Sequence, residues 1–190
     1  METEKVAAMR IVGGKHKGRR LSPPEGLDIR PTSDRAREAL FNILSHGDYG
    51  GLPAGKMVLD SFAGTGALGF EALSRGAAVV CFIERNKLAV RRIRDMAEEL
   101  GEQVQVLHRD ATQPGAAPNT FDLVLLDAPY RTGQSEPSLL ALAEGGWLAN
   151  GCTCCVELAR KEHFQAGASF TMLDERTYGA ARIIILRWSA

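Results

Sequence analysis

The residues most suited to chemistry lie in Leu125-Leu-Asp-Ala-Pro-Tyr130, where a carboxylate, a proline-fixed turn and an aromatic ring follow an apolar run. Asp127 and the carbonyl of Ala128 can accept N–H bonds from a planar amino group, while Tyr130 stacks on the ring that carries it. Such contacts turn the lone pair of an exocyclic amine out of conjugation and make the amine a better nucleophile. The alternative is a β-turn with a core tyrosine.

A glycine-rich turn, Gly64-Thr-Gly66-Ala-Leu-Gly69, follows the apolar run that ends at Asp60 and opens a helical pattern. In this context G-x-G-x-x-G is typical of a nucleotide-binding turn, because glycine lets the backbone approach a ligand closely. Asp60 would repel a pyrophosphate, so the turn favours a ligand with an ammonium or amino-acid end. The alternative is a structural strand–helix turn.

Two further carboxylates follow the next two apolar runs. Glu84 lies about 20 residues beyond Gly64, where an acidic side chain can accept both ribose hydroxyls. Asp110, in Arg109-Asp-Ala111, lies where the adenine of a ligand would sit in a doubly wound sheet. The alternatives are a helix-capping glutamate and an ordinary loop carboxylate.

Strand and helix patterns alternate along the chain and would position these residues. Apolar runs predict strands over residues 56–60, 78–83, 103–107, 121–126, 152–158, 169–173 and 181–188. Helical spacing predicts helices over residues 35–44, 66–74, 86–100 and 137–144, and Asn150-Gly151 predicts a turn. This alternation indicates a three-layer α/β fold with a doubly wound, mostly parallel sheet and an antiparallel C-terminal strand.

Length and charge suggest how the chain is divided. The 190 residues fit one domain with a small extension. We therefore expect an N-terminal basic arm and helix over 1–50 and the main domain over 51–190. The formal net charge is zero, yet six basic residues and no acidic one lie between Lys5 and Arg20. This arm predicts local contact with a polyanion, and the alternative is a solvated tail.

Other features of the sequence argue against a secreted, a membrane-spanning or a metal-binding protein. The first residues contain no apolar segment of a signal peptide, and the longest uncharged runs are shorter than the roughly 20 residues of a membrane span. The four cysteines, Cys81, Cys152, Cys154 and Cys155, have neither C-x-x-C spacing nor a nearby histidine. We expect a cytoplasmic protein with reduced thiols, no membrane span and no metal site.

Together these motifs resemble the class I S-adenosylmethionine-dependent methyltransferases, and more narrowly the RsmD family of bacterial ribosomal RNA guanine-N2 methyltransferases. The resemblance covers nearly the whole chain and is most specific in Arg30-Pro-Thr-Ser-Asp-Arg-Ala-Arg-Glu-Ala-Leu-Phe-Asn42. The family usually has Asp-Pro-Pro-Tyr or Asp-Pro-Pro-Phe, whereas this chain has Ala128 at the first proline. Alanine keeps the carbonyl and loses only a backbone restraint of about 0.4–1 kcal/mol, so we expect activity to be retained.

The resemblance implies methyl transfer from S-adenosyl-L-methionine to N2 of one guanine in 16S ribosomal RNA within a small-subunit particle, by a monomer without a metal. It implies that a catalytic turn holds the flipped base; this turn comprises Asp127, Ala128, Pro129 and Tyr130. The cofactor-binding residues implied are Asp60, Phe62, Ala63, Gly64, Thr65, Gly66, Gly69, Glu84, Asp110 and Ala111. The residues expected to face RNA or close over the site are Arg10, Lys15, Lys17, Arg19, Arg20, Arg30, Thr32, Arg35 and Arg37. Arg37 could instead be a solvated helix residue that pairs with Asp34.

Two other functions fit parts of the pattern. The same fold could methylate adenine N6 in DNA or RNA, or a glutamine amide, since those enzymes use a similar turn; no separate DNA-recognition domain is visible. A non-catalytic RNA-binding assembly factor would explain the basic arm equally well. Asp60, Glu84, Asp127 and Tyr130 argue against that interpretation.

Overall fold

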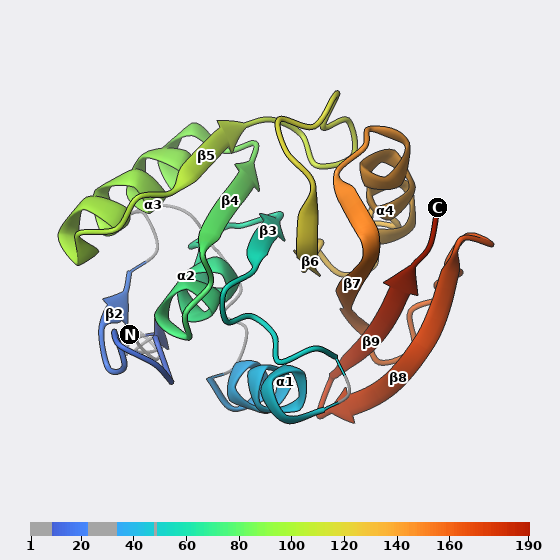
Figure 1. Cartoon of the computed structure of the whole chain (residues 1–190), viewed down its shortest axis with the longest axis horizontal. Coiled ribbons are helices and arrows are strands. Elements are labelled where there is room, and N and C mark those ends of the chain that lie inside the picture. The colour runs from blue at the N-terminus through green and yellow to red at the C-terminus, as the bar shows by residue number, and fades with distance from the viewer. Residues whose placement is uncertain (1–8, 23–33, 48) are drawn as a thin grey trace, which may run out of the picture.

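The computed structural model describes residues 9–22, 34–47 and 49–190, and a seven-stranded sheet forms its centre (Figure 1). The sheet contains β3 (Met57–Ser61), β4 (Val79–Glu84), β5 (Gln105–His108), β6 (Phe121–Leu126), β7 (Leu148–Ala159), β8 (Phe170–Tyr178) and β9 (Ala181–Trp188). The strand order is β5-β4-β3-β6-β7-β9-β8. Strands β3 to β7 pair in parallel, and β9 lies antiparallel between β7 and β8. From β3 the chain continues to β4 on one side of the sheet, and from β6 it continues to β7 on the other side. The boundary between β3 and β6 is therefore the topological switch point of the sheet.

Helices cover both faces of the sheet. They are α1 (Asp34–His46), α2 (Ala67–Ser74), α3 (Lys87–Leu100) and α4 (Ser135–Glu144). Alternate residues of the parallel strands point to opposite faces: Val58 packs in the core shared with α1, α2 and α3, whereas Leu59 packs in the core shared with α4. The predicted three-layer α/β fold is confirmed. None of the described helices is long and apolar enough to cross a membrane.

The basic N-terminal segment contains a small hairpin that the sequence did not reveal. Its strands, β1 (Met9–Arg10) and β2 (Arg20–Leu21), pair antiparallel, and Met9, Ile11 and Leu21 are buried in the core shared with α2. The hairpin is attached to the end of α2, where the backbone N–H of Lys15 donates to the Ser74 carbonyl at 2.8 Å. Gly14 has φ +75° against that carbonyl, where a side chain would clash.

Two strands extend well beyond their predicted bounds: β8 continues to Tyr178 instead of ending at Leu173, and β7 starts before the predicted Cys152. Strand β7 begins at Leu148, so Asn150-Gly151 lies inside it and the predicted turn is wrong. Pairing between β6 and β7 is irregular just there, between Phe121 and Leu123, because Gly151 with φ +78° interrupts the regular strand. All four cysteines are free and buried in β4 and β7, where they belong to the core.

Candidate active site

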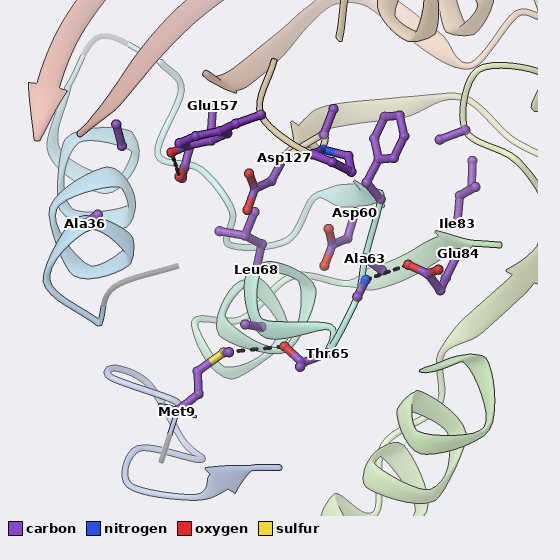
Figure 2. A pocket seen from close by; sticks show the side chains of 18 of the residues that line it. Met9, Ala36, Asp60, Ala63, Thr65, Leu68, Ile83, Glu84, Asp127 and Glu157 are labelled. Carbon is purple, nitrogen blue, oxygen red and sulfur yellow. Dashed lines mark hydrogen bonds between the residues drawn. The ribbon is translucent and has the colours of Figure 1, made fainter. Parts of the chain in front are cut away.

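The carboxyl ends of β3, β4 and β6 open into a cavity of about 630 Å³ (Figure 2). The loop after β3, the end of β4 and the turn after β6 form one side of its lining. The rest of the lining includes Met9 of β1, Ala36 of α1, Glu157 of β7 and residues 178–181 at the turn from β8 to β9. Ligands of open α/β sheets bind at this position, outside the strand ends at the switch point.

The lining of the cavity is acidic overall, because it contains carboxylates from four segments, Asp60, Glu84, Asp127 and Glu157, against two arginines, Arg85 and Arg109. Burial raises the pKa of the Asp60 carboxyl well above its ordinary value of 3.8, and the negative charges of Asp127 and Glu84 raise it further. The hydrogen bond from the Gly69 N–H acts in the opposite direction. A site with this charge favours a cationic ligand and disfavours a pyrophosphate.

Two of these carboxylates also hold the glycine-rich loop in place. Asp60 Oδ2 accepts the Gly69 N–H at 2.8 Å. Glu84 Oε2 accepts the Gly64 N–H at 2.8 Å (Figure 2). Gly66 precedes the first residue of α2 with a φ of +76°, a left-handed conformation that favours glycine. A Cβ on Gly69 would overlap the Phe82 ring, so this glycine serves the close packing of α2 on β4.

Backbone strain marks both edges of the cavity. Phe62, directly after β3, has φ +64°, and Arg131, directly after Tyr130, has φ +59°. No other non-glycine residue in the described part of the chain has a positive φ. Such conformations cost about 1–3 kcal/mol each and gather at functional sites.

Asp110 lies beside the cavity without lining it. Its Oδ1 accepts the Thr112 hydroxyl at 2.7 Å and the Thr112 N–H at 2.8 Å, and these hydrogen bonds lower its pKa. Ala111 and Arg109 do line the cavity. The structure therefore brings Ala111 to the site as expected and gives Asp110 a role in shaping the turn after β5.

The turn after β6 brings its aromatic ring to a carboxylate from β7. The Tyr130 hydroxyl donates to Glu157 Oε1 at 2.7 Å. Asp127 is half-buried, whereas Ala128 is buried and packs its methyl group in the core shared with α4. Sequence analysis missed Glu157, although a glutamate in the apolar run Cys154–Ala159 was a usable signal.

Several of the predicted RNA-facing residues form contacts within the protein. Arg10 pairs with Asp34 at 3.2 Å, Lys15 with Glu102 at 2.5 Å, and Arg19 donates to the Glu99 carbonyl at 3.1 Å. Three others, namely Lys17, Arg20 and Arg35, are exposed. Arg30 and Thr32 lie outside the described residues.

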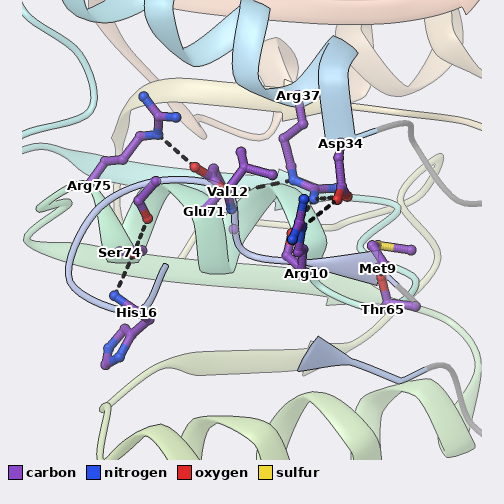
Figure 3. Close-up of polar contacts among 12 residues, drawn as sticks. Met9, Arg10, Val12, His16, Asp34, Arg37, Thr65, Glu71, Ser74 and Arg75 are labelled. Carbon is purple, nitrogen blue, oxygen red and sulfur yellow. Dashed lines mark hydrogen bonds and ion pairs between the residues drawn. The ribbon is translucent and has the colours of Figure 1, made fainter. Parts of the chain in front are cut away.

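Arg37 does not face RNA in this structure. Its side chain is 0% exposed, pairs with Asp34 at 2.8 Å and with Glu71 at 3.6 Å, and donates to the Arg10 carbonyl (Figure 3). The sequence interpretation of Arg37 as a solvated helix residue that pairs with Asp34 is correct for the pairing and wrong for the solvation, because the side chain is buried. The prediction of a phosphate contact is wrong for Arg37 because Glu71, far along the sequence, stabilises the guanidinium in the core.

The buried Asp60 carboxylate predicts a pH-dependent stability change. The folded protein holds the Asp60 proton more tightly than the unfolded chain, so stability from this group falls as pH rises from about 3.8 through the raised pKa. We expect Asp60→Asn, which can still accept the Gly69 N–H, to raise Tm at pH 8 by roughly 2–4 °C, equivalent to about 1 kcal/mol. Thermal melts should show a smaller increase in the Tm of Asp60→Asn over the parent at pH 5 than at pH 8. An unchanged or lower Tm at pH 8 would contradict the expected effect of burying Asp60.

The strand order, the glycine-rich loop after β3 and the turn after β6 define a class I methyltransferase fold. A solved structure described as a putative methyltransferase, yhhF, from Escherichia coli matches with TM-score 0.81 and 33% identity, covering 95% of this chain and 98% of that one. The chain belongs to the family described as Conserved hypothetical protein 95, whose model matches residues 9–187.

Curated relatives confirm the resemblance to the RsmD family. Ribosomal RNA small subunit methyltransferase D of Haemophilus influenzae is 34% identical over 178 residues, which cover 90% of this chain and 89% of the relative. The protein of the same name from Escherichia coli (strain K12) is 37% identical over 151 residues, covering 78% and 74%. The family match over residues 9–187 spans the hairpin, the cavity and the C-terminal strands.

Proposed function

We propose that this protein transfers a methyl group from S-adenosylmethionine to N2 of a guanine in small-subunit ribosomal RNA. The observation that carries the proposal is the turn Asp127–Tyr130, joined to Glu157 at the mouth of an acidic cavity. The names of the curated relatives support ribosomal RNA as the acceptor. The fold and the acidic lining support the methyl donor.

The cavity fits this cofactor because the donor carries two positive charges, a sulfonium and an ammonium. Asp60 would face the amino-acid end and Glu84 the ribose hydroxyls, while Phe62 and Ala111 supply apolar contacts in the lining. When bound, the cofactor supplies an electrophilic methyl group, so neither a metal nor a protein nucleophile is needed. The protein contributes positioning, and holding two reactants in line can lower the free-energy barrier of a reaction by about 7–11 kcal/mol.

Two of the carboxylates that line the cavity, Asp127 and Glu157, favour guanine over adenine as the base that is bound. Ionised Asp127 and Glu157 only accept hydrogen bonds, and guanine presents two adjacent donors, N1–H and the N2 amine. Adenine presents an N1 lone pair beside its N6 amine, which a carboxylate would repel. A glutamine amide has no ring for Tyr130 to stack on.

The residues then act on the amine in a defined way. Asp127 and the Ala128 carbonyl accept the N2 hydrogens, which turns the nitrogen lone pair toward the cavity. Glu157 fixes the Tyr130 ring through its hydroxyl, so that the ring can hold a flipped base without rotating away. A non-catalytic assembly factor would need neither the cavity nor its four carboxylates.

Base analogues test the proposal directly. RNA with inosine in place of the modified guanine lacks the amine and should accept no methyl group. With 2-aminopurine, which keeps the amine but has an N1 acceptor, we expect transfer about 10²-fold slower than with guanine, because buried polar groups are left mismatched. The Glu157→Gln amide can donate a hydrogen bond to N1 of 2-aminopurine. In this variant the difference in transfer rate between guanine and 2-aminopurine should therefore become smaller. Transfer to inosine RNA at the guanine rate would overturn the proposal.

A further inference from the structure

A second hollow lies beside the cavity and has the opposite charge. This basic groove has a volume of about 1020 Å³ and is lined by Tyr130, Arg131, Ala159, Arg160, Lys161, Glu162, Gly179 and Ala180. It shares Tyr130, Gly179 and Ala180 with the cavity, so the two are continuous. Tyr130 therefore stands between a region lined by carboxylates and a region lined by cations.

The three cations of the basic groove are available to a ligand. Arg131, Arg160 and Lys161 are all exposed, and no ion pair or side-chain hydrogen bond holds any of them in the described part of the chain. The single acid, Glu162, is already engaged locally, since its Oε2 accepts the Ala159 N–H at 3.1 Å. The groove therefore carries an unbalanced positive charge, unlike the hairpin, where Lys15 and Arg10 are paired with acids.

The backbone beneath these cations is fixed. The Arg160 N–H donates to the Ala180 carbonyl at 2.8 Å, and the Glu162 N–H donates to the Ala159 carbonyl at 2.9 Å. Arg131 adopts its left-handed conformation directly after Tyr130. The cations thus come from two segments that both line the groove, the turn after β6 and the residues directly after β7.

We propose that the basic groove binds the phosphodiester backbone of the RNA strand next to the target base, an inference that rests on the function proposed above. A base turned into the cavity over Tyr130 must leave its flanking phosphates outside the acidic lining. Arg131, Arg160 and Lys161 meet those phosphates with opposite charge. The groove thereby selects a nucleotide within a strand over a free nucleoside, which has no flanking phosphate.

The test uses the full chain with Arg160→Gln and Lys161→Gln together, because both side chains are exposed and neither lines the cavity. RNA affinity should fall on the order of tenfold, and the slope of log K against log salt should become shallower by about 0.7 for each phosphate that the variant no longer neutralises. Cofactor affinity and kcat at saturating RNA should stay at the parent values. Inorganic phosphate should compete only far above the concentration of RNA phosphate.

The matched control is Lys56→Gln with Arg91→Gln, which removes two charges from residues that line neither hollow. It should keep the salt slope of the parent. If the groove variant binds RNA like this control while the parent still methylates RNA, the groove assignment is overturned and the proposed function stands. If the parent itself neither binds nor methylates RNA, both fail.

Discussion

Replacing Asp127 with alanine is expected to lower kcat for methyl transfer by about 10²–10³-fold, the usual effect of removing one preorganised polar group from a transition state. The half-buried Asp127 lines the cavity at the carboxyl end of β6, next to the Ala128 carbonyl. Its hydrogen bond with the amine matters most when the lone pair is aligned for transfer. The loss should therefore appear in kcat more than in KM for RNA.

Asp127→Asn provides the matched control, because its amide oxygen can still accept an amine hydrogen. It should lose less activity than Asp127→Ala in single-turnover assays. Both variants should bind the cofactor and melt close to the parent temperature. A folded Asp127→Ala protein that transfers methyl groups at the parent rate would show that the turn is not the reaction site.

Replacing Glu71 with alanine is expected to destabilise the fold by about 3–5 kcal/mol, because it removes the buried carboxylate that faces both Arg37 and Arg75 and leaves the Val12 N–H without its acceptor. Glu71 is 0% exposed and accepts the Arg75 Nε–H at 2.7 Å and the Val12 N–H at 2.8 Å. One carboxylate thus joins α2 to α1 and to the hairpin, as Figure 3 shows. Tm should fall by about 2–4 °C for each kcal/mol of stability removed.

Glu98→Ala on α3 is the control, since Glu98 is exposed; its effect should stay within about 0.5 kcal/mol. Adding Arg37→Met to Glu71→Ala should recover part of the stability lost, because it removes a buried cation that would keep its pair with Asp34 but lose the buried carboxylate of Glu71. Denaturant and thermal unfolding measure both effects. A Glu71→Ala protein as stable as the Glu98→Ala control would contradict the role assigned to this network.

The sequence predicted the fold where local pattern decides it. Strand β6 lies at the predicted residues 121–126 and β9 at 181–188, because uninterrupted apolar runs in a covered sheet have few alternatives. The sequence placed the glycine-rich loop and the turn after residues 121–126 at the carboxyl ends of two predicted strands, which meet at the crevice of an open parallel sheet. Their meeting around one cavity follows from that topology.

The features that sequence analysis missed all depend on contacts between distant residues. The Tyr130 hydroxyl meets Glu157 only when β6 and β7 pair, and Arg37 is buried only because Glu71 lies beneath α1. The hairpin around Gly14 needs the end of α2 to support it. Likewise, the basic groove joins Arg131 to Arg160 across two strand ends, so no local run of basic residues predicts it.

The most direct test of the central claim is the identity of the methylated nucleoside. Small ribosomal subunits that lack the modification are incubated with the purified protein and isotope-labelled S-adenosylmethionine, and the RNA is digested to nucleosides for mass spectrometry. We expect the label in N2-methylguanosine at a single position, and its loss with Asp127→Ala. Label in N6-methyladenosine or in protein, or no label from a folded protein that binds the cofactor, would contradict the proposed function.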